Sequence, residues 1–409
     1  MVYLYYGGED MLTQFNFKNF KAYKNLTTLE MQAEKDDDFS ETLLEVDGSK
    51  EKFLPVSVLY GPNGGGKTTV LEALICLITH VTSPINLLKY NKQILKISAT
   101  PFEFSKNNIV EFEIFFIENN YEYKYIMKIE EENILKEELY RTQLMAKKPE
   151  MIFIREVDEI TLGTNLKKNK VNTVVNSQLP YLSFLAISYN IDIIEDAISF
   201  FKNARFINID SSEKIPQKLL EMEEYKKVFL EILNSIDSCI IDFIIEKEEN
   251  DNSYKVFTIH EVGGKRYKLN LYKESKGTIK IFSILPTILS ALLNGGLCII
   301  DELDSKLHPK LLRYIIELFK EKNINLSNAQ LIFTSHDLVT MNHDVFRRDE
   351  ILFAAKNEKE ESELYSLSEI RDENGKSVNK NSSYSKQYLE GRYGSDPYMK
   401  RMKEFSGEE

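Results

Sequence analysis

Cysteine and histidine are scarce in this chain of 409 residues, and neither is clustered. The three cysteines, Cys76, Cys239 and Cys298, lie in apolar runs at wide spacing, and the five histidines are scattered. This spacing excludes a disulfide framework and a cysteine–histidine metal site, and it fits a reducing compartment. We therefore expect a cytoplasmic protein.

Long apolar runs, internal repeats and low-complexity tracts are missing as well. No apolar run approaches the length of a membrane span, and residues 1–11 lack the basic segment of a signal peptide, so we expect no membrane partner. No heptad pattern is sustained over several turns, which argues against long coiled-coil arms. With 43% hydrophobic residues, the chain can bury one large core or two smaller ones.

Basic residues are outnumbered by acidic ones, 52 against 64, which gives a net charge of −12. Proteins that hold DNA mainly through its phosphates usually have a basic surface, so this balance disfavours sequence-independent DNA clamping. The acidic balance does not exclude a local DNA contact. Two small basic clusters, at residues 167–170 and 265–268, are better explained as solvated loop and hairpin surfaces, and the acidic turn at residues 357–363 as a solvated turn.

The most informative segment that is present is a glycine-rich loop between a predicted strand and a predicted helix. Residues 53–60 form an apolar, β-branched run typical of a buried strand, and residues 70–80 have helical spacing. The loop between them matches the phosphate-binding pattern G-x-x-x-x-G-K-[ST]. A chance match is the alternative, but this strand and this helix are the context that the motif needs. The chain is therefore predicted to bind ATP or GTP.

Each part of this loop has an expected role. Backbone N–H groups at the glycines converge on the phosphates, and the helix dipole adds partial positive charge. Lys67 would reach the β- and γ-phosphate oxygens and contribute to catalysis, and the hydroxyl of Thr68 would bind Mg²⁺. The predicted nucleotide-binding residues of the loop are Gly61, Pro62, Asn63, Gly64, Gly65, Gly66, Lys67, Thr68 and Thr69.

A second predicted strand ends in two carboxylates. Residues 297–300 are apolar, and Asp301 and Glu302 follow them. Because ligands bind outside the carboxyl ends of strands in open α/β sheets, Asp301 is expected to hold Mg²⁺ and Glu302 to orient or deprotonate the attacking water. A strand that ends in two acidic residues is weak evidence for a nucleotide site when it occurs alone. In a sequence that also contains the phosphate-binding loop, it becomes strong evidence. A third strand is predicted from the apolar residues 331–333 and ends in the polar cap Thr334, Ser335 and His336, although a lone histidine is more often structural.

In this order, the motifs resemble those of the ABC-type ATPase heads of the RecF and SMC families. Residues 61–69 resemble the Walker A loop, and residues 297–302 resemble the Walker B strand. Residues 303–305 resemble the D-loop, and residues 274–278 resemble the signature motif. Residues 15–23 are similar to the strand with which these proteins begin.

The resemblance implies further site residues. Ser275 and Gly277 would bind the γ-phosphate held by the other subunit, and His336 would contact the γ-phosphate of its own subunit as a catalytic residue. Asp304 would lie across the dimer seam, with a helix N-cap as the alternative. Gln93 precedes a predicted strand where a Q-loop glutamine could stand, but a surface role is favoured.

With the closing motif at residues 388–394, the succession resembles the stand-alone ABC-type, AAA-family ATPases of bacterial phage-defence and abortive-infection loci, relatives of the OLD nucleases. This resemblance implies ATP and Mg²⁺ as cofactors, at least a homodimer, and an effector such as a Toprim or other nuclease. Because only residues 337–409 follow His336, we expect the effector to be a separate protein. A RecF-like DNA-repair ATPase clamp and an assembly scaffold driven by ATP or GTP are the alternatives.

The expected fold is α/β, a P-loop NTPase of the ABC-ATPase head type with a mixed-sheet core, an antiparallel β subdomain and a helical lid subdomain. Antiparallel strands are predicted over residues 94–157, with a turn at Asn119 and Asn120, and helices over residues 178–234. The expected divisions are residues 1–140 with Walker A, residues 141–273 as a helical and β insertion, residues 274–370 with the signature, Walker B, D-loop and switch histidine, and residues 371–409 as a C-terminal tail.

Overall fold

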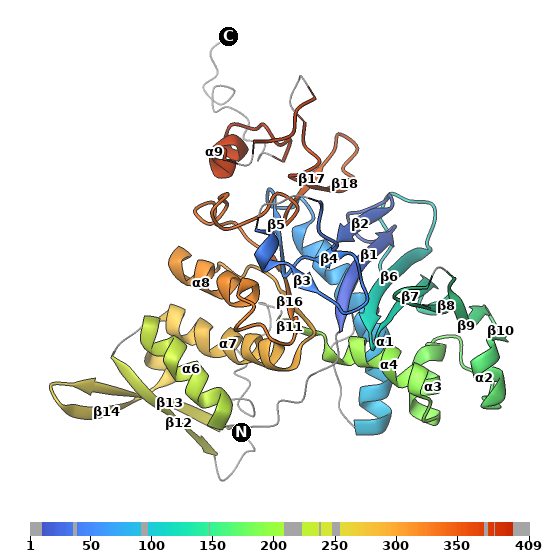
Figure 1. Cartoon of the computed structure of the whole chain (residues 1–409), viewed down its shortest axis with the longest axis horizontal. Helices are drawn as coiled ribbons and strands as arrows, with labels where there is room; N and C mark the ends of the chain where they lie inside the picture. Colours follow the sequence, from blue (N-terminus) through green and yellow to red (C-terminus); the bar gives the residue numbers. More distant parts are fainter. Residues whose placement is uncertain are drawn as a thin grey trace.

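The computed structural model describes residues 10–35, 39–90, 97–146, 148–207, 223–236, 239–247, 254–371, 375–379 and 381–395. The fold is α/β, as expected from the sequence. Two large sheets pack on either side of helix α1 (Lys67–Tyr90), whose buried side chains join the cores of both (Figure 1).

The first large sheet carries the nucleotide-binding motifs. Its order is β11-β15-β16-β5-β17-β18, in which the first five strands are parallel and β18 pairs antiparallel at the edge. The bounds are β5 (Val56–Tyr60), β11 (Arg205–Ile207), β15 (Leu297–Ile300), β16 (Gln330–Thr334), β17 (Ile351–Lys356) and β18 (Ser362–Ser366). Both faces of these parallel strands are covered, which explains why β5 and β15 are buried throughout and mostly apolar rather than alternating.

Helices cover this sheet on its two faces. Leu59 and Ile299 point into the core shared with α1, whereas Val58 and Ile300 point into the core on the opposite face. That opposite core is closed by α6 (Glu223–Ile236), α7 (Lys276–Asn294) and α8 (Pro309–Lys320). Helix α7 contains Pro286 and continues through this proline.

The second large sheet is antiparallel, in the order β10-β9-β8-β7-β6-β1-β2. Its strands are β1 (Met11–Lys18), β2 (Thr27–Glu30), β6 (Val110–Glu118), β7 (Tyr121–Glu130), β8 (Asn133–Gln143), β9 (Glu150–Glu156) and β10 (Glu159–Leu162). Asn119 and Asn120 both have positive φ, 47° and 64°, and form the predicted turn between β6 and β7. The domain division remains a prediction, and residue 140 lies within β8.

Two secondary-structure predictions need correction. Residues 97–109 were expected to be β and contain no strand, because Pro101 has no N–H to donate and the Asn107 side chain closes a turn by accepting from the N–H of Ile109. The helical stretch expected from residue 178 is interrupted by β11, where Arg205 donates to the carbonyl of Gly295 at the sheet edge. Residues 208–222 lie outside the described residues.

The remaining elements are small, apart from one projecting sheet. Helices α2 (Thr164–Lys168), α3 (Tyr181–Ser188) and α4 (Asp192–Asn203) lie on the side of the antiparallel sheet (Figure 1). The short elements are η1 (Ser40–Thr42), β3 (Leu44–Glu45), β4 (Lys52–Phe53), η2 (Leu271–Lys273) and α9 (Tyr384–Leu389). Strands β12 (Ile240–Lys247), β13 (Tyr254–Val262) and β14 (Lys265–Asn270) form a three-stranded sheet that projects beyond α6 and α7 (Figure 1).

By length and composition, α1 and α7 could each cross a membrane. In both, 72% of the most apolar window is buried inside the protein, as in the core helices of a folded domain. In addition, α1 begins within the predicted Walker A loop and α7 within the predicted signature motif. We therefore interpret both as core helices.

Candidate nucleotide-binding site

The glycine-rich loop turns from the end of β5 into the first turn of α1, at the carboxyl edge of the parallel sheet. Gly61 has a φ of 144°, and a Cβ at this position would lie 2.1 Å from the carbonyl oxygen of Ala354 on β17. Gly66 has a φ of 107°, and its Cβ would lie 2.8 Å from Oγ of Ser362. Neighbouring backbone and side chains therefore require glycine at both positions, and β17 supports the loop from behind.

Lys67 is held inside this loop. Its Nζ donates to the carbonyl oxygens of Gly61 (2.8 Å) and Pro62 (3.1 Å). Burial lowers the pKa of Lys67, and the nearby carboxylates, Asp301 first among them, oppose that shift. The ammonium group thus occupies the place where a phosphate-binding lysine is needed, beside the N-terminus of α1.

The Walker A and Walker B motifs meet through side chains. Oγ1 of Thr68 lies 3.1 Å from Oδ1 and 3.0 Å from Oδ2 of Asp301. Thr334, the last residue of β16, donates its hydroxyl to Oδ1 of Asp301 (2.5 Å) and accepts from the N–H of Glu302 (2.7 Å). Both acidic residues are therefore oriented by Thr334, which the sequence analysis did not include among the site residues.

Glu302 itself is exposed and has a φ of 45°, in the left-handed region that few residues other than glycine adopt. Such backbone conformations are concentrated at functional sites. Glu302 directly follows Asp301 at the strand end, which leaves its carboxylate accessible to a ligand over the loop.

The next residues link the D-loop to the switch histidine. Oδ2 of Asp304 accepts from the backbone N–H of His336 (3.1 Å). The helix that follows, α8, is capped by His308, whose side chain accepts from the N–H of Lys310. Asp304 is therefore not the N-cap residue of α8, and the alternative role considered for it is not supported.

The oxygen atoms beside the phosphate loop suit Mg²⁺ bound together with a nucleotide. No group of three or more histidine, cysteine or acidic side chains in the described part of the chain could hold a metal alone. Mg²⁺ usually keeps several waters and is bound by one or two protein oxygens together with nucleotide phosphates. Thr68 and Asp301 supply two adjacent oxygen ligands beside the phosphate loop, so these residues fit a metal that arrives with a nucleotide.

The signature residues lie elsewhere. Ser275 is the exposed N-cap of α7, and its Oγ accepts from the N–H of Thr278 (3.1 Å). A Cβ on Gly277 would lie 3.3 Å from the carbonyl oxygen of Lys306, behind the Walker B strand. Neither residue lines the pocket at the phosphate loop of the same chain, as far as the described residues show.

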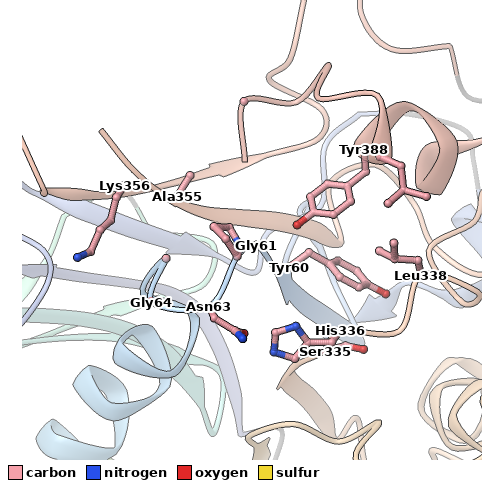
Figure 2. A pocket seen from close by; sticks show the side chains of 14 residues that line it. Tyr60, Gly61, Asn63, Gly64, Ser335, His336, Leu338, Ala355, Lys356 and Tyr388 are labelled. Carbon is pink, nitrogen blue, oxygen red and sulfur yellow. The ribbon is translucent and has the colours of Figure 1, made fainter. Parts of the chain in front are cut away.

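That pocket has a volume of about 870 Å³ and opens beside the outer side of the loop. Asn63 and His336 project into it (Figure 2). Its lining residues are Tyr60, Gly61, Pro62, Asn63, Gly64, Gly65, Ser335, His336, Leu338, Ala355, Lys356, Tyr388, Leu389 and Gly394.

The last three of these residues belong to the closing motif, which sequence reasoning alone could not explain. Tyr388 stacks on Phe353 of β17 with ring centroids 5.7 Å apart, and Tyr393 packs on the same ring at 5.2 Å. Phe353 directly precedes Ala354, the residue behind Gly61. The closing motif therefore packs on the strand that supports the phosphate loop. Gln93 lies outside the described residues.

A glycine-rich loop at a helix N-terminus, a lysine within it and a threonine bonded to the carboxylate of a neighbouring strand are the features of a P-loop nucleotide-binding domain. The family model described as "AAA domain, putative AbiEii toxin, Type IV TA system" matches residues 56–342. Because this match covers well over half of the sequence, the chain belongs to that family.

Similarity to individual proteins is more remote. The crystal structure of the SmcHead bound to the C-winged helix domain of ScpA is similar at 13% sequence identity and a TM-score of 0.44, covering 87% of this chain and 97% of that chain. No curated protein matches significantly.

Proposed function

We propose that the chain is an ATPase that binds and hydrolyses ATP with Mg²⁺, dimerises around ATP, and thereby regulates a separate nuclease or toxin in cytoplasmic antiviral defence. The observation that carries the catalytic part is the contact between Thr68 and Asp301, which joins the phosphate loop to the Walker B carboxylates. Membership of a family described as a putative toxin of a toxin–antitoxin system supports a link to such systems.

In this proposal each residue of the site has one task. The loop N–H groups and Lys67 bind the phosphates, and Thr68 and Asp301 hold Mg²⁺, which supplies charge neutralisation when bound. Glu302 orients or deprotonates the attacking water, and His336, which projects into the pocket, contacts the γ-phosphate.

The position of the signature supports the proposed dimer. Ser275 is exposed and lies outside the pocket at its own phosphate loop, so a second chain is needed to bring this hydroxyl to the γ-phosphate. A symmetric pair would place two such caps, one on each loop. Hydrolysis would then reopen the pair and change what the effector can do.

A pull-down tests the regulatory part. The tagged chain is expressed from its own locus with its neighbouring genes, as wild type and as Glu302→Gln, and co-purifying chains are identified by mass. Recovery of a neighbour-encoded nuclease or toxin, in amounts that differ between the two forms, is the expected result. A protein without partners, whose ATP hydrolysis rises with duplex or gapped DNA, would overturn the effector proposal in favour of a DNA-repair clamp.

A further inference from the structure

One short stretch of this acidic chain is strongly basic, and it leads directly into the signature. Residues 265–276 contain five cations and a single acid, Glu274. The cations are Lys265, Arg266, Lys268, Lys273 and Lys276, and all five are exposed. The stretch comprises β14, the 3₁₀ turn η2 and the start of α7. We call β13, β14 and η2 together the basic arm.

The outer part of the basic arm is uncovered. The inner end of its sheet packs on helices, because Phe243, opposite Thr258 in the ladder, packs edge to face against Phe229 of α6 and Phe282 of α7. Farther along the same face, Val262 and Tyr267 are 59% and 53% exposed. Lys268 pairs with Glu246, whereas Lys265 and Arg266 have no ion pair among the described residues. Large apolar side chains beside such cations are typical of a surface that contacts another macromolecule.

The basic arm is hydrogen-bonded to Glu274, the residue before the signature serine. The carboxylate of Glu274, which directly precedes Ser275, is nearly buried, and it accepts from Nε2 of His260 (2.6 Å) and from the hydroxyl of Thr258. Both donors belong to β13. A ligand that fixes the arm would therefore also fix the position of Ser275.

An acidic surface lies beside the phosphate loop. The turn between β17 and β18, residues 357–361, contains three glutamates and one lysine. Glu361 is buried and pairs with Lys24, and Glu360 pairs with Lys356. Ser362, the first residue of β18, donates its N–H to the carbonyl of Ala22, and its Oγ is the atom nearest to a Cβ placed on Gly66. Glu358 is exposed at the outer end of this turn and has no ion pair among the described residues.

We infer that the basic arm of one copy lies on the acidic turn of a second copy when Ser275 caps the phosphate loop of that second copy. This inference rests on the proposed ATP-bound dimer and names the surface that aligns it. Because the arm joins Ser275 and the acidic turn adjoins the loop, one arrangement of two copies brings both contacts together. The six residues of β14 span roughly 20 Å, so the arm extends well beyond Ser275. Opposite charges here would guide and orient the closing pair.

Charge reversal tests this contact in the Glu302→Gln background, with ATP and Mg²⁺, by measuring the dimer dissociation constant at low and moderate salt. The double change Lys265→Glu with Arg266→Glu should weaken the dimer by about tenfold or more, and added salt should reduce the difference. Adding Glu358→Lys and Glu360→Lys on the acidic turn should restore part of the loss. The matched control reverses Lys167 and Lys168, an exposed basic pair on α2, and should leave the dissociation constant unchanged.

The outcomes separate the two claims. A dimer that forms with ATP but is insensitive to Lys265 and Arg266 overturns the inference and leaves the ATP-bound dimer standing. A dimer insensitive to these residues, together with lost binding of a fluorescent single-stranded DNA, assigns the arm to nucleic acid and also overturns it. If the Glu302→Gln protein stays monomeric with ATP, the proposed function itself fails.

Discussion

Thr68 donates its hydroxyl to the carboxylate of Asp301, although 233 positions separate the two residues in the chain. The contact is possible because β5 and β15 flank β16 in a parallel sheet, so that both motifs end at the same edge. It brings a hydroxyl and a carboxylate to the mouth of the phosphate loop, which is the arrangement that a Mg²⁺–nucleotide complex requires.

Thr334→Val should lower catalysis more than it lowers nucleotide binding. The change keeps the shape of the side chain but removes the hydroxyl that orients Asp301 and bonds to the N–H of Glu302. We expect kcat for ATP hydrolysis to fall by up to about 100-fold, with a much smaller change in KM. Steady-state kinetics measures both. Thr79→Val is the control, because this buried threonine bonds only to a carbonyl of its own helix. Equal losses in the two variants would contradict the role given to Thr334.

Gly61→Ala should destabilise the fold even without nucleotide. The added methyl group would lie 2.1 Å from the backbone oxygen of Ala354, so β17 or the loop must shift. We expect a loss of about 3 kcal/mol or more in the free energy of unfolding. Gly64→Ala is the matched change: its φ of 76° costs about 1–2 kcal/mol, and no atom lies within 4 Å of the new Cβ. Denaturant unfolding measures both free energies. A larger loss of unfolding free energy in Gly64→Ala than in Gly61→Ala would contradict the close contact between Gly61 and Ala354.

Lys67→Ala should weaken ATP binding itself. The variant removes the cation held over the loop carbonyls, where the phosphate oxygens are expected. We expect the dissociation constant for ATP to rise at least about tenfold, measured by calorimetry or a fluorescent analogue. Lys310→Ala, an exposed change at the start of α8, serves as the control. ATP binding that is unaltered in the Lys67 variant would remove this lysine from the site.

Glu118→Gln should make the protein more stable in mildly alkaline solution. Burial, followed by the charges of Asp10 and Asp196, raises the pKa of Glu118 from 4.5 to about 9. The folded state thus keeps a proton that the unfolded state releases, and stability falls as pH rises between these two values.

The amide of the Glu118→Gln variant carries no charge at any of these pH values, so the pH dependence over this window should shrink. The gain near pH 8 should be on the order of 1–2 kcal/mol in unfolding free energy. Glu159→Gln, an exposed change on β10, is the control. A slope with pH that is the same in wild type and in Glu118→Gln would show that Glu118 does not carry this effect.

The sequence was sufficient to predict the parts of the fold whose signal is local. The mostly apolar run of β5 with the glycines after it, and the apolar run of β15, identify the P-loop and Walker B strands, because strands buried on both faces lack the alternation of a half-exposed strand. The turn at Asn119 and Asn120 was predictable for a similar reason, since asparagine tolerates positive φ.

Features that depend on tertiary contacts were not predictable in this way. Nothing near Thr334 in the sequence shows that its hydroxyl will lie between Asp301 and Glu302, because the pairing of β15 with β16 brings them together. The strand β11 was missed because only three residues pair with β15 after a helix. The position of Tyr388 in the lining of the pocket depends on its stacking with Phe353, 35 positions earlier in the chain.

The most direct test of the central claim is the mass of the Glu302→Gln protein in solution, with ATP and Mg²⁺ and without them. Loss of the residue that acts on water should slow hydrolysis by about 100-fold or more and leave ATP binding intact. We predict a monomer without nucleotide and a dimer with ATP, and a monomer in both conditions when Ser275→Arg is added. A Glu302→Gln protein that hydrolyses ATP at the wild-type rate, or that binds ATP and remains monomeric, would contradict the account.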